Sequence, residues 1–346
     1  MRASSQYTPM VLRIYRAAIP PKLFVGLILS TTLFLILSLL TLNFSERKEI
    51  FLPVVVMDFA LLTVCFFSIP PLLDYLVRSL EPTYLAAQVL SDLRELVDKE
   101  NSSKEQNLML EVSQDRSFLE RANYSIEIQN TSEGYLQSVD YKKLAQIGCE
   151  ENLTLAVPYR LGEFILQNAG LVYVNADSKL SPSTVKKIKS CFILGSERVK
   201  IGDLELQLEE LVYITLAALS PGVNDFSTAL HCISSVTAAC NMVVNFSFKP
   251  GVYKDEKERP RVFAKEFDFE GFMHCAFDRI RVAVRKQPSV AQYVLNNLHE
   301  LSKNCVNRER VKVLEQIASQ TIEDCKEQCI DYELGKMQSV YKLLSK

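Results

Sequence analysis

Two long apolar runs near the N-terminus constrain this chain more than any other feature. Residues 23–43 carry no charged side chain, and residues 51–75 carry only Asp58 and Asp74. A helix of about 20 such residues crosses a hydrocarbon core of about 30 Å. Because the link at residues 44–50 is short and polar, we expect an antiparallel transmembrane hairpin. A cleavable signal peptide does not fit, because the first run is too long, lacks a small-residue cleavage site and precedes a second run.

Basic residues around the hairpin predict its orientation. Five lie in the flanks (Arg2, Arg13, Arg16, Lys22 and Arg78), and two lie in the link (Arg47 and Lys48). Cytoplasmic flanks carry the excess of Lys and Arg in membrane proteins. The count therefore predicts both termini in the cytoplasm.

The rest of the composition is typical of a soluble domain in a reducing compartment. Formal net charge is −2, and tryptophan is absent, so no nucleic-acid partner is expected. Nine cysteines are an odd, scattered set, unlike a secreted disulfide framework. Cys325 and Cys329 share a helix face, but two ligands do not make a zinc site. Neither a metal nor a cofactor is predicted.

Hydrophobic periodicity predicts a membrane-anchored α+β protein. A basic juxtamembrane segment (1–22) and the hairpin precede an amphipathic connecting helix at 80–100, where Leu85, Val89, Leu93 and Val97 recur. A small β-rich domain is expected at 107–178. Its strands lie near 122–129, 134–139, 152–157, 162–166 and 171–175, with one helix at 140–149. Residues 181–346 are expected to form an all-helical cytoplasmic domain, in which 246–267 is a charged loop or hairpin.

Asp58 lies inside the second apolar run. An intramembrane carboxylate suggests a proton or cation relay. The alternative is a protonated Asp that faces the neighbouring helix and bonds to Thr31, Thr32 or Ser38. Pro70 and Pro71 are expected to break or kink this helix at its cytoplasmic end.

One junction between two apolar helices, ALSPGVNDFSTAL at residues 218–230, stands out. Pro221 cannot continue a helix, and Gly222 can adopt positive φ. Asp225 is the natural N-cap of the next helix, whose N-terminus suits an anion or a partner carboxylate. The predicted ligand-binding set is Ser220, Gly222, Asn224, Asp225 and Thr228. The alternative is a well-capped interhelical turn without a ligand.

This junction resembles a family of bacterial predicted membrane proteins, domain of unknown function 2254, which carries a similar S-P-G-I-N-D-P-x-T-A turn. The resemblance extends to ASSQYTPMVLR (3–13), GYLQSVDY (134–141), RLGEFI (160–165), LGSERV (194–199) and FEGFMHCAFDRIR (269–281). It implies location in the bacterial inner (plasma) membrane.

This sequence also departs from the family pattern. Phe226 replaces the family's proline, and Tyr213 and Ala217 replace an acidic and a basic residue. The resemblance implies two further membrane helices before residue 3, so a shortened or divergent member is expected.

Three functions of different classes fit these observations. The first is a regulatory or scaffolding membrane protein whose cytoplasmic domain binds a protein or small ligand. The second is a subunit of a homo-oligomeric transporter or channel, with Asp58 lining the path. The third is an enzyme using Ser220, Asn224 and Asp225, ranked last because no nucleophile elbow, P-loop or dinucleotide fingerprint is present. Apart from the lipid bilayer, no partner is named by the sequence.

Overall fold

A computed structural model describes residues 19–44, 51–78, 81–105, 126–176, 179–198, 204–248 and 251–344. The chain forms two compact units, residues 1–88 and 89–346. Residues 3–13, which contribute to the resemblance, lie outside the described part.

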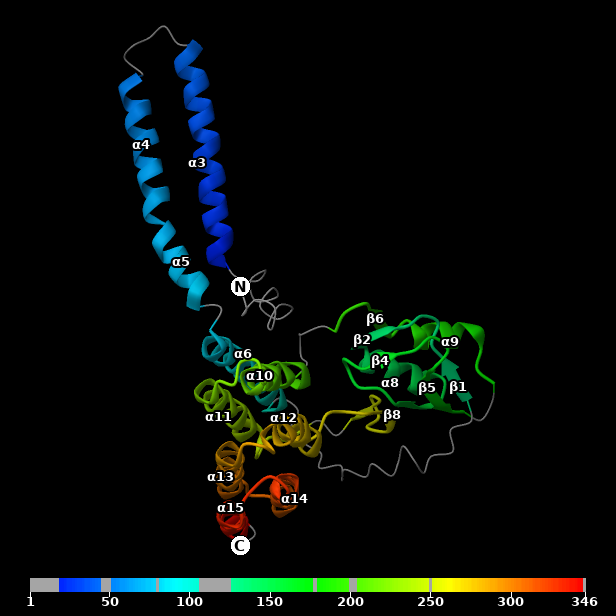
Figure 1. Ribbon diagram of the computed structural model, residues 1–346. Helices are drawn as coiled ribbons and strands as arrows, with labels where there is room; N and C mark the ends of the chain where they lie inside the picture. The colour runs from blue at the N-terminus through cyan, green and yellow to red at the C-terminus, as the bar shows by residue number, and fades with distance from the viewer. Residues whose placement is uncertain are drawn as a thin grey trace. The chain divides into compact units, whose positions relative to one another are not determined.

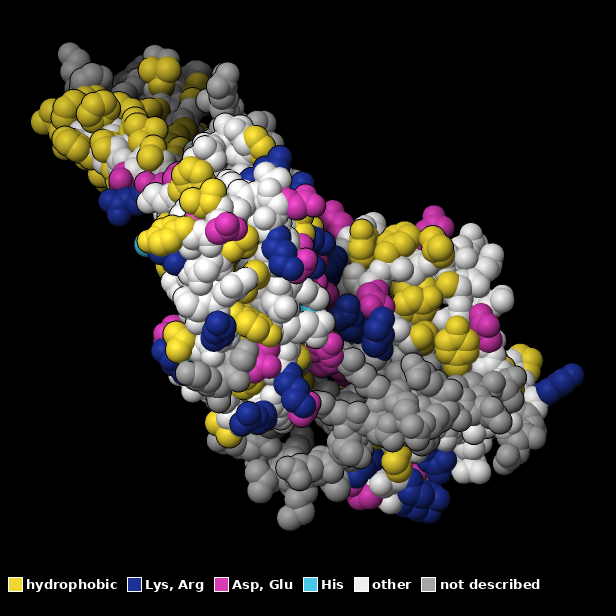
Figure 2. Space-filling view, turned by 60° about the horizontal axis from the view of Figure 1, so that its bottom comes forward, with side chains coloured by type: hydrophobic (Ala, Val, Ile, Leu, Met, Phe, Trp, Pro, Cys, Tyr) yellow, Lys and Arg dark blue, Asp and Glu magenta, His cyan; other side chains and the backbone are white. Residues whose placement is uncertain are grey.

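The first unit contains an antiparallel pair of apolar helices, α3 (Ile19–Phe44) and α4 (Phe51–Phe67), followed by α5 (Ile69–Arg78) (Figure 1). Among the described residues, two helical stretches, 22–40 and 52–78, are long and apolar enough to cross a membrane. A helix from a soluble core would bury such side chains, but Leu29, Phe59 and Phe66 are 64%, 72% and 68% exposed. In Figure 2 the described side chains of the hairpin, at upper left, present a largely hydrophobic surface.

Helix α6 (Pro82–Glu105) begins in the first unit and continues into the second. The four apolar residues of the predicted connecting helix, Leu85, Val89, Leu93 and Val97, are all buried. Their four-residue spacing keeps them on one side of the helix. The sequence predicted a connecting helix at 80–100, and the structure has α6 at Pro82–Glu105.

A β lobe opens the second unit. It contains β1 (Ile126–Gln129), β2 (Gly134–Val139), α8 (Tyr141–Glu150), β3 (Thr154–Val157), β4 (Phe164–Ile165), β5 (Gly170–Asn175), α9 (Pro182–Lys189) and β6 (Phe192–Gly195). The strands form a three-stranded sheet, β4-β2-β6, and a five-stranded sheet, β1-β5-β3-β8-β7, to which the later strands β7 (Val252–Lys254) and β8 (Pro260–Ala264) belong. Leu144, Leu155 and Ile165 are fully buried in their common core. The predicted strands and the predicted helix at 140–149 coincide with these elements wherever the residues are described.

The prediction of an all-helical domain from residue 181 is wrong. Strand β6 pairs with β2, and residues 246–267 contain the hairpin β7 (Val252–Lys254) and β8 (Pro260–Ala264). Strand β8 runs parallel to β3, with Leu155 opposite Val262. The open edge of β3 is thereby paired, and Val262 is fully buried. A charged segment thus returns to the β lobe and completes its larger sheet.

The remaining helices form a bundle. They are α10 (Leu204–Leu219), α11 (Phe226–Val243), α12 (Phe269–Val284), α13 (Pro288–Asn304), α14 (Arg308–Cys325) and α15 (Asp331–Leu344). Helix α12 packs against α10 and α14, and its Phe272 and Phe277 are fully buried. The close apolar spacing of α12 in the sequence explains this central place.

Candidate functional site

The predicted binding turn connects α10 to α11. Both Val223 and Asn224 donate their backbone N–H groups to the Ser220 carbonyl, at 3.0 and 2.9 Å. Asn224 takes the left-handed conformation, with φ of 49°. The sequence indicated that Gly222 can adopt positive φ. In the structure the positive φ of this turn is at Asn224, two residues later. Asparagine is the non-glycine residue that best tolerates it.

Asp225 is the N-cap of α11, as the sequence predicted. Its Oδ1 accepts the backbone N–H of Thr228 at 3.1 Å, and its Oδ2 accepts the Thr228 hydroxyl at 2.6 Å. These hydrogen bonds, with the Thr228 hydroxyl contributing most, hold the pKa of Asp225 below its ordinary value. The Ser220 hydroxyl donates to the Ala217 carbonyl at 2.7 Å. The structure thus brings Ser220, Asn224, Asp225 and Thr228 together, in contacts that a capped turn explains.

Apolar side chains project beside this turn. Val223 is 39% exposed and Phe226 is 43% exposed, although most large apolar side chains of α10 and α11 are buried. The resemblance implies a proline at 226, where this sequence has an exposed aromatic ring.

Tyr213 is a third exposed residue, two turns before Ser220 on the same helix, and is 52% exposed. The guanidinium of Arg279, on α12, lies 5.3 Å from the centre of its ring. A hydrogen bond to Tyr213 raises the pKa of Arg279, the largest of several effects. The resemblance implies an acidic residue at 213, and the tyrosine present here is a hydrogen-bond acceptor for Arg279.

A cluster of half-buried charges, which no sequence pattern indicated, lies next to Tyr213. Arg198 contacts Glu205 at 3.3 Å and Glu209 at 2.8 Å. From the β lobe, Arg160 reaches Glu205 at 3.3 Å. Arg279 approaches Glu209 at 3.8 Å.

The segments that supply these charges are RLGEFI, LGSERV, α10 and FEGFMHCAFDRIR, all but α10 quoted for the resemblance. The charged residues within these motifs were the signal that the sequence offered. Motifs far apart in the sequence do not reveal which of their charges pair. The cluster connects the β lobe to the helical bundle.

Asp58 faces α3 within the hairpin. Ser38 Oγ lies 2.8 Å from Asp58 Oδ2 and 3.1 Å from the Leu35 carbonyl. Thr31 and Ser38 are nearly buried, and they lie seven residues apart on one side of α3. Of the three hydroxyls named from the sequence, Ser38 is the one bonded to Asp58. The other carboxylate oxygen, Oδ1, is buried without a hydrogen-bond partner.

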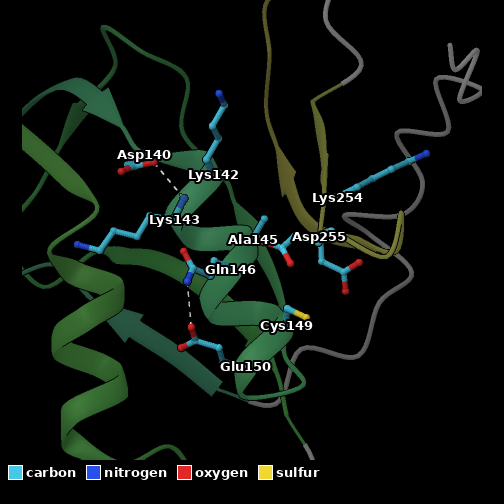
Figure 3. Close-up of a pocket in the computed structure, with 10 residues that line it drawn as sticks. Asp140, Lys142, Lys143, Ala145, Gln146, Cys149, Glu150, Lys254 and Asp255 are labelled. Atoms are coloured by element: carbon cyan, nitrogen blue, oxygen red, sulfur yellow. Dashed lines mark hydrogen bonds between the residues drawn. The ribbon is translucent and has the colours of Figure 1, made fainter. Parts of the chain in front are cut away.

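A groove of about 880 Å³ lies between α8 and the β7–β8 turn (Figure 3). Lys142, Cys149 and Lys254 are among its lining residues. Asp255, also in the lining, has a buried carboxylate that bonds to the backbone N–H groups of Lys257 and Arg259 and to the Arg261 guanidinium.

Burial alone would raise the pKa of Asp255, but these donors outweigh it and hold the pKa well below its ordinary value. The carboxylate therefore builds the hairpin turn. With Asp255 committed to the turn, the described lining has three acidic and three basic residues, so neither sign of charge dominates it.

Comparison with known proteins identifies a family and several relatives of this chain. The family model for predicted membrane proteins of the DUF2254 family matches residues 1–300, so this chain belongs to that family. Uncharacterized proteins Mb1321c of Mycobacterium bovis and Rv1290c of Mycobacterium tuberculosis are each 25% identical over 190 residues. The match covers 54% of this chain and 36% of each relative, so the chain spans about a third of their length. No solved structure matches.

Proposed function

We propose that this protein is a multi-pass protein of a bacterial inner membrane, with both flanks of its helical hairpin in the cytoplasm. The family description and the exposed apolar surface of α3 and α4 support a membrane location. Five basic residues in the flanks against two in the link support the orientation.

The cytoplasmic part, in this proposal, regulates or scaffolds by binding a partner. The observation that carries this is the group of exposed interaction-prone side chains on α10, the turn and α12: Tyr213, Val223, Phe226 and Arg279. Aromatic and arginine residues dominate the energetics of protein interfaces. The turn residues Ser220, Gly222, Asn224, Asp225 and Thr228 would shape the same surface, with the N-terminus of α11 available to a carboxylate or another anion.

Site-specific photocrosslinking in cells tests the partner. A photoreactive side chain at Phe226 is expected to capture one defined species, and the same probe at Tyr332, a 68% exposed aromatic on α15, serves as the matched control. Equal capture at both sites would leave the turn without a specific role.

The orientation has its own test. A cysteine at Ser45, in a background without the native cysteines, is expected to react with a membrane-impermeant thiol reagent in intact cells. A cysteine at Ser103 is expected to react only after the membrane is opened. The reverse pattern would place the large domain outside.

The alternative function is a subunit of an oligomeric transporter or channel. The buried Oδ1 of Asp58, which has no hydrogen-bond partner, supports this alternative. The two candidate spans found among the described residues cannot enclose a path without further copies. Crosslinking in native membranes that yields monomer alone would remove this alternative.

A further inference from the structure

The second apolar segment contains a break that locates the membrane surface. Helix α4 ends at Phe67, Ser68 forms a turn, and α5 begins at Ile69 with Pro70 and Pro71 in its first turn. Proline has no backbone N–H. The carbonyls of Phe66 and Phe67, four residues earlier, therefore lose their helical donors.

Three donors at the break are committed to other acceptors. The Ser68 N–H points at the Val64 carbonyl, at 3.1 Å, and the Leu72 N–H at the Ser68 carbonyl, at 3.3 Å. The Ser68 hydroxyl donates to the Cys65 carbonyl at 2.6 Å. An unsatisfied carbonyl in hydrocarbon is costly, whereas at the headgroup level water supplies the donor. The carbonyls of Phe66 and Phe67 thus mark where hydrocarbon ends.

The length of α4 agrees with this boundary. Its 17 residues extend about 26 Å at about 1.5 Å per residue. That is the short end of the range for a spanning helix, about 17–25 residues. Helix α4 thus reaches most of the way across a core of about 30 Å, and the first residues of α5 are left at the boundary.

The two sides of α5 differ. An exposed apolar stripe passes through the break at helical spacing, from Leu62 and Phe66 on α4 to Ile69, Leu73 and Val77 on α5. Beside it, Asp74 and Arg78 form an exposed ion pair at 3.0 Å. A helix with an apolar stripe and a charged side is suited to the boundary between headgroups and acyl chains.

We infer that α5 is a bilayer-interface helix, and that the lipid headgroup layer is its binding partner. Ile69, Leu73 and Val77 contact the upper acyl chains, and the Asp74–Arg78 pair lies among headgroups and water. The apolar stripe is continuous with the exposed surface of α4, which is why lipid rather than protein is assigned to it. This inference rests on the proposed membrane-spanning hairpin.

The absence of tryptophan from the chain gives a direct test, because one introduced Trp is the sole source of indole fluorescence. Full-length Leu73→Trp, Phe59→Trp and Tyr332→Trp proteins are reconstituted into phosphatidylcholine–phosphatidylglycerol vesicles. The lipids carry bromine either near the headgroup or near the end of the acyl chain. Phe59 is the middle residue of α4, and Tyr332 is exposed on the soluble unit.

We expect Leu73→Trp to be quenched more by shallow bromine than by deep bromine, with emission shifted to shorter wavelength than that of Tyr332→Trp. Phe59→Trp should show the opposite quenching preference. No quenching of Phe59→Trp would overturn the membrane-spanning hairpin itself. With Phe59→Trp quenched, a Leu73→Trp signal that is unquenched, or quenched best by deep bromine, would overturn the interfacial assignment alone.

Discussion

The helical hairpin and the helical bundle are built from similar side chains in opposite arrangements. In the bundle, Phe272 and Phe277 are fully buried, and most charged side chains lie outside, with Glu210 on α10 a buried exception. In the hairpin, Phe59 and Phe66 are exposed, while Thr31, Ser38 and Asp58 lie in the seam between α3 and α4. Helical periodicity alone does not tell these arrangements apart, because both have one distinct side.

This difference in which side chains are buried indicates the solvent of each region, water around the bundle and lipid around the hairpin. Water drives apolar side chains together, so the bundle gains stability from burying them. Lipid tails are as apolar as leucine, so the hairpin gains from packing and from hydrogen bonds between helices. Identical substitutions should therefore have unequal effects in the two regions.

Removing a phenyl ring should give the largest difference in stability loss between the bundle and the hairpin. Phe277→Ala, in the bundle core, should lower the free energy of unfolding by about 3–5 kcal/mol through lost burial and the cavity left behind. Phe59→Ala should change it by less than about 0.5 kcal/mol, because lipid fills the space. Thermal unfolding in nanodiscs, followed by circular dichroism, measures both. A large loss from Phe59→Ala would mean that protein, not lipid, covers α4.

Replacing a leucine of the hairpin and a similarly exposed isoleucine of the soluble unit with lysine should give the next largest difference in free energy. Leu33 and Ile330 are 60% and 65% exposed. Leu33→Lys places a charge in the middle of α3 and should cost about 2.5–3.5 kcal/mol of insertion free energy. Ile330→Lys, in water, should cost less than about 0.5 kcal/mol. The fraction of protein resistant to carbonate extraction reports the first effect, and equal fractions for both variants would contradict a lipid-facing α3.

Local patterns predicted the hairpin, α6, α12 and most strands, because their signals repeat within a few residues. Pairings between distant segments left no such signal. Strand β8 joins β3 across about a hundred residues, Leu155 opposite Val262, in a stretch that the sequence predicts to be a charged loop or hairpin. The charges of that stretch are used locally, since Asp255 accepts from Arg261 at 3.0 Å.

The candidate site was predicted in part for the same reason. Asp225 as an N-cap follows from the order of neighbouring residues, and the structure contains that cap. The contact of Arg160 with Glu205 joins residues from two lobes, and the sequence shows only that both charges exist. The exposure of Tyr213 and Phe226 likewise depends on which sides of α10 and α11 the bundle covers.

Asp225 should have a smaller effect that separates capping from binding. Asp225→Ala should lower the free energy of unfolding by about 0.5–2 kcal/mol, through loss of the cap. Asp225→Asn restores a capping oxygen and most of that stability. If the partner recognises the carboxylate of Asp225, the Asp225→Asn variant should fold, but a photoreactive probe at Phe226 should no longer capture the partner. Full capture by Asp225→Asn would show that the charge is dispensable.

The acid dependence of the same residue gives a control on this interpretation. The pKa of Asp225 is lowered by its hydrogen bonds to Thr228. A lowered carboxyl pKa stabilises the fold above the unfolded-state pKa, about 3.9, and this stability is lost as pH falls through the folded-state pKa. The stability difference between wild type and Asp225→Ala should therefore shrink on acidification below about pH 4. A difference that is constant through that window would assign the loss to something other than the carboxylate.

The smallest effect is expected from removing single hydrogen bonds between helices, one in the hairpin and one in the bundle. Ser38 bonds to Asp58 in the hairpin at 2.8 Å, and Ser234 on α11 bonds to Tyr293 on α13 at 2.7 Å. Ser38→Ala should cost about 0.6 kcal/mol, and at most about 1.7 kcal/mol, the range measured between membrane helices. Ser234→Ala should cost less, because its contact is exposed and water replaces the lost partner. Unfolding in mixed detergent and dodecyl sulfate micelles measures both variants on one scale. A greater loss from Ser234→Ala would mean that water reaches Asp58 as readily as it reaches Tyr293, and the seam between α3 and α4 would then not be shielded by lipid.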